Sequence, residues 1–201
     1  MPSLRFARAE TSFGPMWVAE TDLGVAAISR DESPGDLLES LRRRFRSVRA
    51  SPGHLELAWL TDALAGGPLP AVDLRGLSPF DARVYAAVRL VTSASTVTYG
   101  DVAVVIGAAG AARAVGGALA RCPLFPAVPC HRVVRASDGW SGWGSDVALK
   151  RWLLAAERAT APGADAVGSA SEPTELPTSW QHRPLRLLRR RGPRHLPSGP
   201  C

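Results

Sequence analysis

The sequence contains no apolar run long enough to cross a membrane and no apolar core near its N-terminus of the kind that a secretory signal needs. Cysteine is scarce, and Cys122, Cys130 and Cys201 are an odd, scattered set that predicts no disulfide framework. No CxxC or HxxxH spacing indicates a zinc site. We therefore expect a cytoplasmic, reducing location and neither a metal nor any other cofactor.

Lysine and arginine outnumber the acidic residues by 24 to 18, so the net charge is +6 and the pI is about 10.2. This balance favours an anionic partner, nucleic acid first, although solubility alone could explain it. Residues 162–201 are rich in Ala, Gly, Ser, Pro and Arg and are expected to form a disordered tail. The tail holds six arginines against three acidic residues, so the rest of the chain is basic in its own right.

The first part of the chain, residues 1–76, is predicted to be a domain of its own. Turn residues separate three apolar runs, which predicts an antiparallel meander. The runs are Leu4–Ala7, Met16–Ala19 and Val25–Ile28. A helix is expected to open at Ser33-Pro34, with Ser33 as its N-cap, and a second short helix over 55–64.

A second region, residues 77–161, is predicted to be mainly helical. Ser78, Pro79 and Asp81 form a helix start, with a capping serine, proline at the first position and an acid at the third. Two short helices, over 99–106 and 111–121, flank a glycine-bearing turn. That arrangement is typical of a helix-turn-helix.

The second of these helices contains two adjacent glycines, Gly116 and Gly117, each of which destabilises a helix interior by about 1 kcal/mol relative to Ala. Another backbone coming close would explain that cost. Because Arg113 is the charged residue of this helix, a phosphate backbone is one candidate. A small-residue helix packed tightly against protein is the other, and the sequence favours neither.

The segment Pro129–Val134 carries the candidate nucleophile, Cys130. His131 and Arg132 bring potential positive charge beside the thiol, and basic neighbours favour the thiolate, which is the nucleophilic form. A Cys-His pair alone is also what a buried structural cysteine beside a hydrogen-bonded histidine looks like. Adjacent side chains of an extended segment point to opposite faces, so His131 would reach the thiol only through a turn or a water.

Two features follow this segment. A glycine-rich loop with two tryptophans, residues 138–145, is either a lid over a flat aromatic ligand or a hairpin turn. The last helix, expected over 146–159, places Glu157 on its buried stripe. A buried carboxylate needs a partner, and His131 is the natural candidate. The alternative is a glutamate that escapes to solvent at the helix end.

The segment Pro129–Val134 resembles the active-site signature of the O6-alkylguanine-DNA alkyltransferases, also called methylated-DNA–protein-cysteine methyltransferases. Three further segments and one residue match that family's order and spacing: Tyr99-Gly100, Ala112–Ala118, Lys150–Leu154 and Glu157. The resemblance covers residues 78–157, is weak before them and is absent from the tail. It implies an α+β fold with a small N-terminal antiparallel sheet and helices (ribonuclease H-like). A mainly helical C-terminal domain would hold the helix-turn-helix and the active-site cysteine.

The resemblance also implies an activity, DNA repair by direct reversal. Cys130 would take a methyl or other alkyl group from O6 of guanine, or from O4 of thymine, in double-stranded DNA and keep it, giving one turnover. His131 would act on the thiol through a water, and Glu157 would orient His131. Tyr99 would help to flip the nucleotide and offer a proton, and Arg113 would fill the gap in the duplex.

The same resemblance assigns further contacts. A monomer would bind the minor groove, away from any membrane, with Ala112, Gly116 and Gly117 beside Arg113 and Tyr99. The base pocket would be lined by Val133, Val134, Trp143, Gly144 and Ser145.

Two departures from the family pattern keep alternatives open. Cys122 stands where the family usually has Asn, and Trp143 where it usually has Tyr. A protein that binds alkylated DNA or senses damage, with weak or no transfer activity, is therefore a second hypothesis, although relatives of that kind carry Trp in place of the cysteine. A cysteine hydrolase is a third, and it would need neither a helix-turn-helix nor Arg113.

Overall fold

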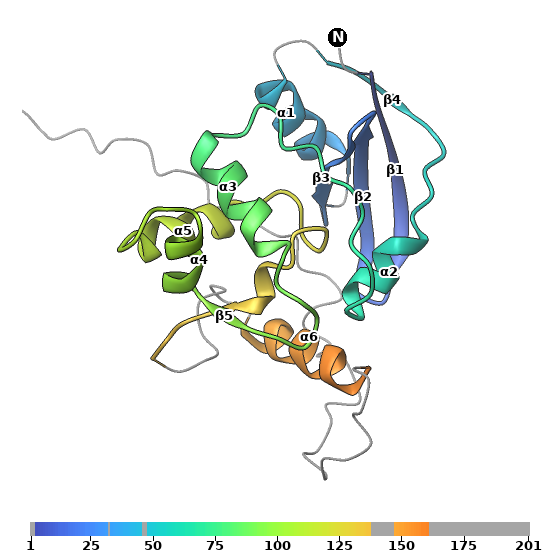
Figure 1. Cartoon of the computed structure of the whole chain (residues 1–201). Coiled ribbons are helices and arrows are strands. Elements are labelled where there is room, and N and C mark those ends of the chain that lie inside the picture. Colours follow the sequence, from blue (N-terminus) through green and yellow to red (C-terminus); the bar gives the residue numbers. More distant parts are fainter. Residues whose placement is uncertain (1–2, 32, 46–47, 138–146, 161–201) are drawn as a thin grey trace, which may run out of the picture.

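The computed structural model describes residues 3–31, 33–45, 48–137 and 147–160. The expected Trp143, Gly144 and Ser145 of the pocket, the loop 138–145 and the tail 162–201 lie outside the described residues. In Figure 1 a small sheet and a group of helices lie on opposite sides of the molecule. The architecture is a mixed α+β fold.

The sheet has the strand order β3-β2-β1-β4. Strands β1 (Ser3–Thr11), β2 (Gly14–Thr21) and β3 (Gly24–Ser29) form the predicted antiparallel meander. The fourth strand, β4 (Arg49–Pro52), pairs in parallel with β1, so the expectation of a purely antiparallel sheet was wrong. Helix α1 (Gly35–Arg44) makes the crossover that a parallel pair requires.

Helix α1 begins one position later than its capping signal suggested. Pro34 occupies the N-cap position and no side chain caps the helix, so Ser33 is not the predicted cap. The helix buries Leu37 and Leu41 against the sheet. Arg44, near its end, donates to the backbone carbonyls of Ala26, Asp73 and Arg75 and so ties the connector before residue 77 to the sheet. The predicted second helix is α2 (Ala58–Leu64).

The C-terminal half is helical, as predicted. Its elements are α3 (Pro79–Val88), β5 (Val97–Thr98), α4 (Tyr99–Val105), α5 (Ala112–Ala120), the 3₁₀ turn η1 (Cys130–Arg132), β6 (Val133–Val134) and α6 (Val147–Ala159). Ser78 caps α3 by accepting the N–H of Asp81 at 3.0 Å. Thr98 and Asp101 form a reciprocal capping box at the start of α4, which fixes where that helix begins.

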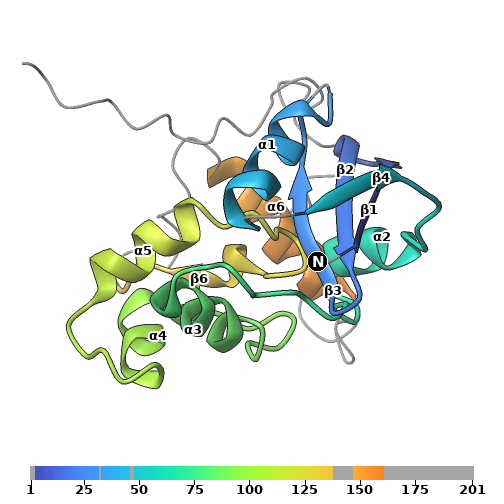
Figure 2. The ribbon, with the colours of Figure 1, turned by 90° about the horizontal axis from the view of Figure 1, so that it is seen from above.

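One apolar core joins the two halves. Met16 and Val18 of the sheet belong to the same buried cluster as Val84 of α3 and Leu153 of α6. The N–H of Ile28 in β3 also donates to the carbonyl of Pro123 at 2.7 Å. Figure 2 shows α3, α4 and α5 gathered at one end and the sheet at the other. Among the described residues, no helix is long and apolar enough to cross a membrane.

Candidate active site

The candidate nucleophile lies in a tight turn between α5 and β6. Cys130, His131 and Arg132 form the 3₁₀ turn η1, in which successive side chains are about 120° apart rather than on opposite faces. The Cys130 thiol donates to the carbonyl of Val128 at 3.2 Å, and the residue is 2% exposed. The thiol is therefore held in place and almost entirely shielded from solvent.

His131 and Glu157 form a fully buried pair. His131 Nε2 lies 2.7 Å from Glu157 Oε1, and both side chains are 0% exposed. A carboxylate only accepts, so Nε2 carries the proton and Nδ1 is the basic nitrogen. Burial lowers the pKa of His131, and the neighbouring Glu157 offsets this only in part. The imidazole is consequently neutral at pH 7 and able to accept a proton.

Glu157 has a second partner, Arg132, which the sequence analysis missed. The Arg132 guanidinium donates through Nη2 to Oε1 at 2.8 Å and through Nε to both oxygens at 3.1 and 3.2 Å. The N–H of Ala94 donates to Oε2 at 3.0 Å, from a residue with a positive φ of 59°. Burial raises the pKa of Glu157, but the hydrogen bonds from His131 and Arg132 outweigh burial and bring the pKa to about 2.

Tyr99, the first residue of α4, is near enough to Cys130 for charge at the thiol to affect its ionisation. Burial, and then negative charge at Cys130, raise the pKa of Tyr99 to about 12, so the phenol keeps its proton at neutral pH. Arg135, an exposed residue just after β6, is near enough to oppose that rise. Tyr99 is thus a neutral phenol in the neighbourhood of Cys130, and the positive charge of Arg135 lies near it.

The glycines of α5 are not required by packing inside the protein. A Cβ added at Gly116 would lie 3.8 Å from the Tyr99 ring, and one at Gly117 would lie 3.4 Å from Arg121 Nη1. Both are ordinary contact distances, so alanine would fit at either position. Tight protein packing, one of the two explanations for these glycines, is therefore excluded for the described residues. Arg113 is exposed in the first turn of the same helix.

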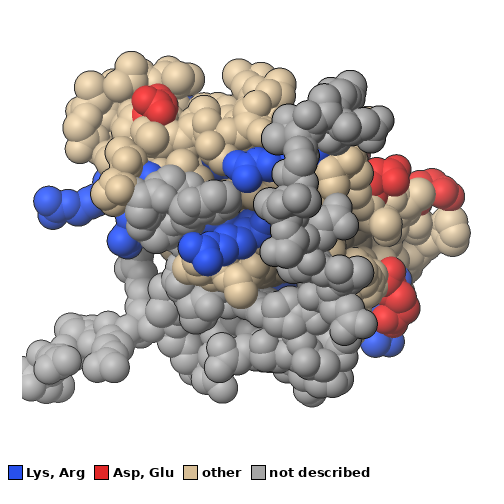
Figure 3. Space-filling model, turned by 90° about the horizontal axis from the view of Figure 1, so that it is seen from below, with Lys and Arg blue, Asp and Glu red and all other residues tan. Residues whose placement is uncertain are grey.

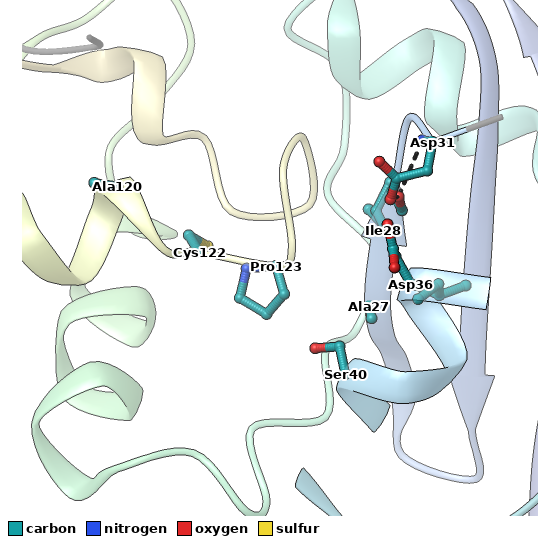
Figure 4. A pocket seen from close by; sticks show the side chains of 10 residues that line it. Ala27, Ile28, Asp31, Asp36, Ser40, Ala120, Cys122 and Pro123 are labelled. Atoms are coloured by element: carbon teal, nitrogen blue, oxygen red, sulfur yellow. Dashed lines mark hydrogen bonds between the residues drawn. The ribbon is translucent and has the colours of Figure 1, made fainter. Parts of the chain in front are cut away.

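Cys122 lies just past the end of α5, near enough to Cys130 for the two side chains to influence each other's ionisation. Burial, and then the neighbouring Cys130 side chain, raise the pKa of the Cys122 thiol well above its usual range. Cys122 also lines a pocket between α5 and the pair α1 and β3 (Figure 4). The sequence marked Cys122 only as a departure from a pattern and gave no sign that it lies near Cys130.

The remaining expected residues are placed as follows. Val133 and Val134 are buried in β6, which pairs in parallel with β5. Lys150 Nζ, also buried, donates to the carbonyl of Val133 at 2.6 Å and holds this strand to α6. Seen from below, Lys and Arg occupy the middle and left of the molecular surface, whereas Asp and Glu gather mainly at its right edge (Figure 3). This face suits an anionic partner.

Comparison with known proteins places this cluster in context. A family model described as "6-O-methylguanine DNA methyltransferase, DNA binding domain" matches residues 79–159. The chain is 36% identical over 157 residues to the "DNA base-flipping protein" of Thermus thermophilus, covering 74% of this chain and 97% of that protein. It is 32% identical over 155 residues to the "Methylated-DNA--protein-cysteine methyltransferase" of Salmonella typhimurium, covering 72% and 90%.

Other matches differ in how much of each chain they cover. Identity reaches 46% with the methyltransferase of Mycolicibacterium paratuberculosis, over 91 residues that make up 45% of this chain and 54% of that one. The crystal structure of Mycobacterium tuberculosis OGT in complex with DNA superposes with a TM-score of 0.60 at 31% identity. That superposition covers 81% of this chain and 96% of the other.

Proposed function

The chain belongs to the family of methylated-DNA–protein-cysteine methyltransferases, and on that premise we propose that it repairs DNA by direct reversal. It transfers a methyl or other alkyl group from O6 of guanine in duplex DNA to its own Cys130. The sulfur keeps the group, so each molecule acts once. The observation that carries the proposal is the buried Cys130–His131–Glu157 cluster, because it joins a nucleophile, a neutral base and an orienting carboxylate.

DNA binding is assigned to α4 and α5, acting as a helix-turn-helix within a C-terminal domain of residues 77–161. The sheet forms a ribonuclease H-like N-terminal domain of residues 1–76. A monomer would lay α5 in the minor groove, with Ala112 and the two glycines against the sugar-phosphate backbone. The room for a Cβ at both Gly116 and Gly117 supports this, because their lack of side chains then serves a partner outside the protein. Arg113 would enter the duplex and take the place of the displaced base.

The burial of Cys130 determines how substrate arrives. The sulfur of a residue that is only 2% exposed cannot meet a base that is stacked in a helix. The alkylated nucleotide must leave the stack and enter a pocket whose floor includes Val133 and Val134, and the pocket must open to admit it. The Tyr99 ring lies near Gly116 of α5 and is within electrostatic reach of Cys130, where it would support the flipped nucleotide.

The chemistry then follows from the proton positions. His131 Nδ1 would take the thiol proton of Cys130 through a water, while Nε2 stays bonded to Glu157. The sulfur attacks the alkyl carbon, the bond from that carbon to O6 breaks, and the electron pair passes to guanine. Tyr99, still protonated at neutral pH, would donate a proton to the departing base and recover one afterwards. Arg132 holds Glu157 ionised, so the carboxylate can stabilise the imidazolium that forms.

The test is to incubate the full chain with a duplex oligonucleotide that carries O6-methylguanine and to measure the intact protein mass. We expect the gain of one methyl group, lost in Cys130→Ala and kept in Cys122→Ser, which is a matched thiol control. A methyl group found on a residue other than Cys130 would overturn the proposal. Catalytic hydrolysis of a thioester or peptide substrate would instead support a hydrolase.

A second function is favoured by one comparison. The Thermus relative, named for base flipping rather than for transfer, is similar over 97% of its length. If this chain shared only that property, it would bind and extrude alkylated guanine without accepting the group. Tight, O6-methylguanine-dependent binding with no change in protein mass would support this alternative.

A further inference from the structure

We propose that Ala94 is a positioning residue: its backbone N–H, held in a left-handed turn, fixes the carboxylate of Glu157 and, through it, the ring of His131. Its meaning for alkyl transfer rests on the proposed function, whereas the placement of Glu157 belongs to the fold alone. Ala94 lies between α3 and β5, 63 residues before Glu157 in the chain. The group that acts is part of the backbone, so no side-chain motif marks it.

The backbone of Ala94 has a conformation that alanine rarely adopts. Its φ is 59°, in the left-handed region, and among the residues that the structure describes it is the one non-glycine residue with a positive φ. A Cβ makes this region unfavourable, so glycine usually occupies it. The turn is closed by the N–H of Ser95, which donates to the carbonyl of Thr92 at 3.3 Å. Strained residues of this kind persist where their surroundings hold them, and they gather at functional sites.

The left-handed turn directs the N–H of Ala94 to one particular oxygen of Glu157. This N–H donates to Oε2 at 3.0 Å, whereas His131 Nε2 lies 2.7 Å from Oε1. The Arg132 guanidinium contacts both oxygens, so among these described partners Ala94 is the donor that contacts Oε2 alone. The bond from Ala94 therefore fixes the rotation of the carboxylate and leaves Oε1 facing the histidine.

Two neighbouring segments hold this turn against Glu157. Gly66, just after α2, has a φ of 88°, and a Cβ added there would collide with Ser93 Oγ and lie 2.9 Å from Glu157 Cγ. On the side of η1, Arg132 Nη1 donates to the carbonyl of Val91 at 2.7 Å. The turn is thus packed against the end of α2 and tied to η1, which keeps its N–H beside the carboxylate.

The loss of this bond should be felt at His131. Nε2 of the imidazole carries the proton because it faces Glu157 Oε1. If the carboxylate rotates away, the two tautomers of the ring become closer in energy. Only the tautomer protonated at Nε2 leaves Nδ1 basic and able to take the thiol proton of Cys130. The turn at Ala94 therefore selects the reactive tautomer by holding Glu157.

The test compares Ala94→Gly with Ala94→Val in the full chain. Glycine accepts the left-handed conformation, so Ala94→Gly should raise the urea midpoint of unfolding and keep the rate of benzyl transfer from free O6-benzylguanine. Valine is branched at Cβ and disfavours that conformation, so Ala94→Val should move the N–H away from Glu157. We expect its transfer rate to fall by at least about tenfold, the usual result of misplacing a reacting group.

The tautomer of His131 is the readout that a merely structural role would not change. ¹⁵N NMR of the imidazole should show the proton on Nε2 in the unsubstituted protein and in Ala94→Gly, and a mixture of both tautomers in Ala94→Val. Ala86→Val is the matched control, because it makes the same substitution at an exposed position of α3. It should lower the urea midpoint, since a branched side chain is less favourable in a helix, and leave both the rate and the tautomer unchanged.

The outcomes separate the role of Ala94 from the repair activity. An unchanged His131 tautomer in folded Ala94→Val would overturn the proposal, whatever the protein transfers. An altered tautomer, when the unsubstituted protein transfers no benzyl group, would support the positioning role and remove the proposed function. If circular dichroism shows that Ala94→Val does not fold, hydrogen exchange in the unsubstituted protein decides. We expect a protected Ala94 amide, and exchange at the rate of an unprotected peptide would overturn the proposal.

Discussion

Replacing Glu157 with glutamine tests the buried cluster most directly. The carboxylate accepts hydrogen bonds from His131, Arg132 and the N–H of Ala94, all of which are donors. Glutamine offers one acceptor oxygen and turns an NH₂ group toward the remaining donors. The Arg132 side chain, 3% exposed, would lose its counter-ion and keep its charge inside the protein. We therefore expect Glu157→Gln to destabilise the fold as well as the site.

The size of this effect can be worked out in two ways. Lowering the pKa of Glu157 from 4.5 to about 2 corresponds to about 3 kcal/mol of stabilisation of the ionised form, at about 1.36 kcal/mol for each pH unit. Independently, removing one partner of a buried ion pair typically costs about 3–5 kcal/mol. Both routes give a loss of about 3–5 kcal/mol, a large part of the total stability of an ordinary domain.

The assay is urea unfolding at pH 7, followed by circular dichroism. Glu10→Gln is the matched control, because the Glu10–Arg8 pair is exposed, and its unfolding free energy should change by less than about 0.5 kcal/mol. The double variant Glu157→Gln/Arg132→Gln should lose less than the sum of the two single losses, since no unpaired charge is left behind. A loss below about 1 kcal/mol in Glu157→Gln would refute the reasoning.

Three further predictions use the same protein. Because burial lowers the pKa of His131, the unfolded chain binds a proton first, so the free energy of unfolding should fall as pH drops below about 6.5 and stay level above it. Urea titrations from pH 8 to 5 check this: His131→Asn should flatten the dependence and His54→Asn, at an exposed site, should not. Gly117→Ala should raise stability by up to about 1 kcal/mol yet weaken duplex binding, and equal binding in a gel-shift titration would contradict the assigned DNA contact. Arg113→Ala should slow repair of duplex DNA by about tenfold or more while sparing reaction with free O6-benzylguanine, and an unchanged ratio of the two rates would remove the extrusion argument.

The sequence predicted elements whose signals are local. The cap of α3 at Ser78 was predicted because its signal lies in neighbouring residues of the sequence. The meander was predicted because turn residues separate its apolar runs. Strand β4 was missed because its four residues show no alternation of buried and exposed side chains and pair through the backbone. Parallel pairing across a helical crossover leaves no such local pattern.

The candidate site was predictable to a similar extent. Glu157 on a buried stripe demanded a partner, and the resemblance put His131 nearby. Arg132 was missed because an extended segment would have pointed it away from His131, whereas the 3₁₀ turn directs both toward Glu157. The position of Cys122 near Cys130 depends on the path of the chain from α5 to η1, which no periodic pattern in the sequence indicates.

The apolar core shared by the sheet and the helices limits how the sequence of such a protein can diverge in evolution. Sequence identity with the paratuberculosis protein is found over 91 residues, yet superposition on a mycobacterial structure extends over 96% of that chain. Met16 and Val18 of the sheet pack into the same apolar core as Val84 and Leu153 of the helices. The sheet therefore helps to hold the helical half, which contains Cys130, in place, and for this its core side chains need only be apolar. If the chain were cut between the sheet and the helical half, neither fragment should fold, so evolution has to keep the two halves together.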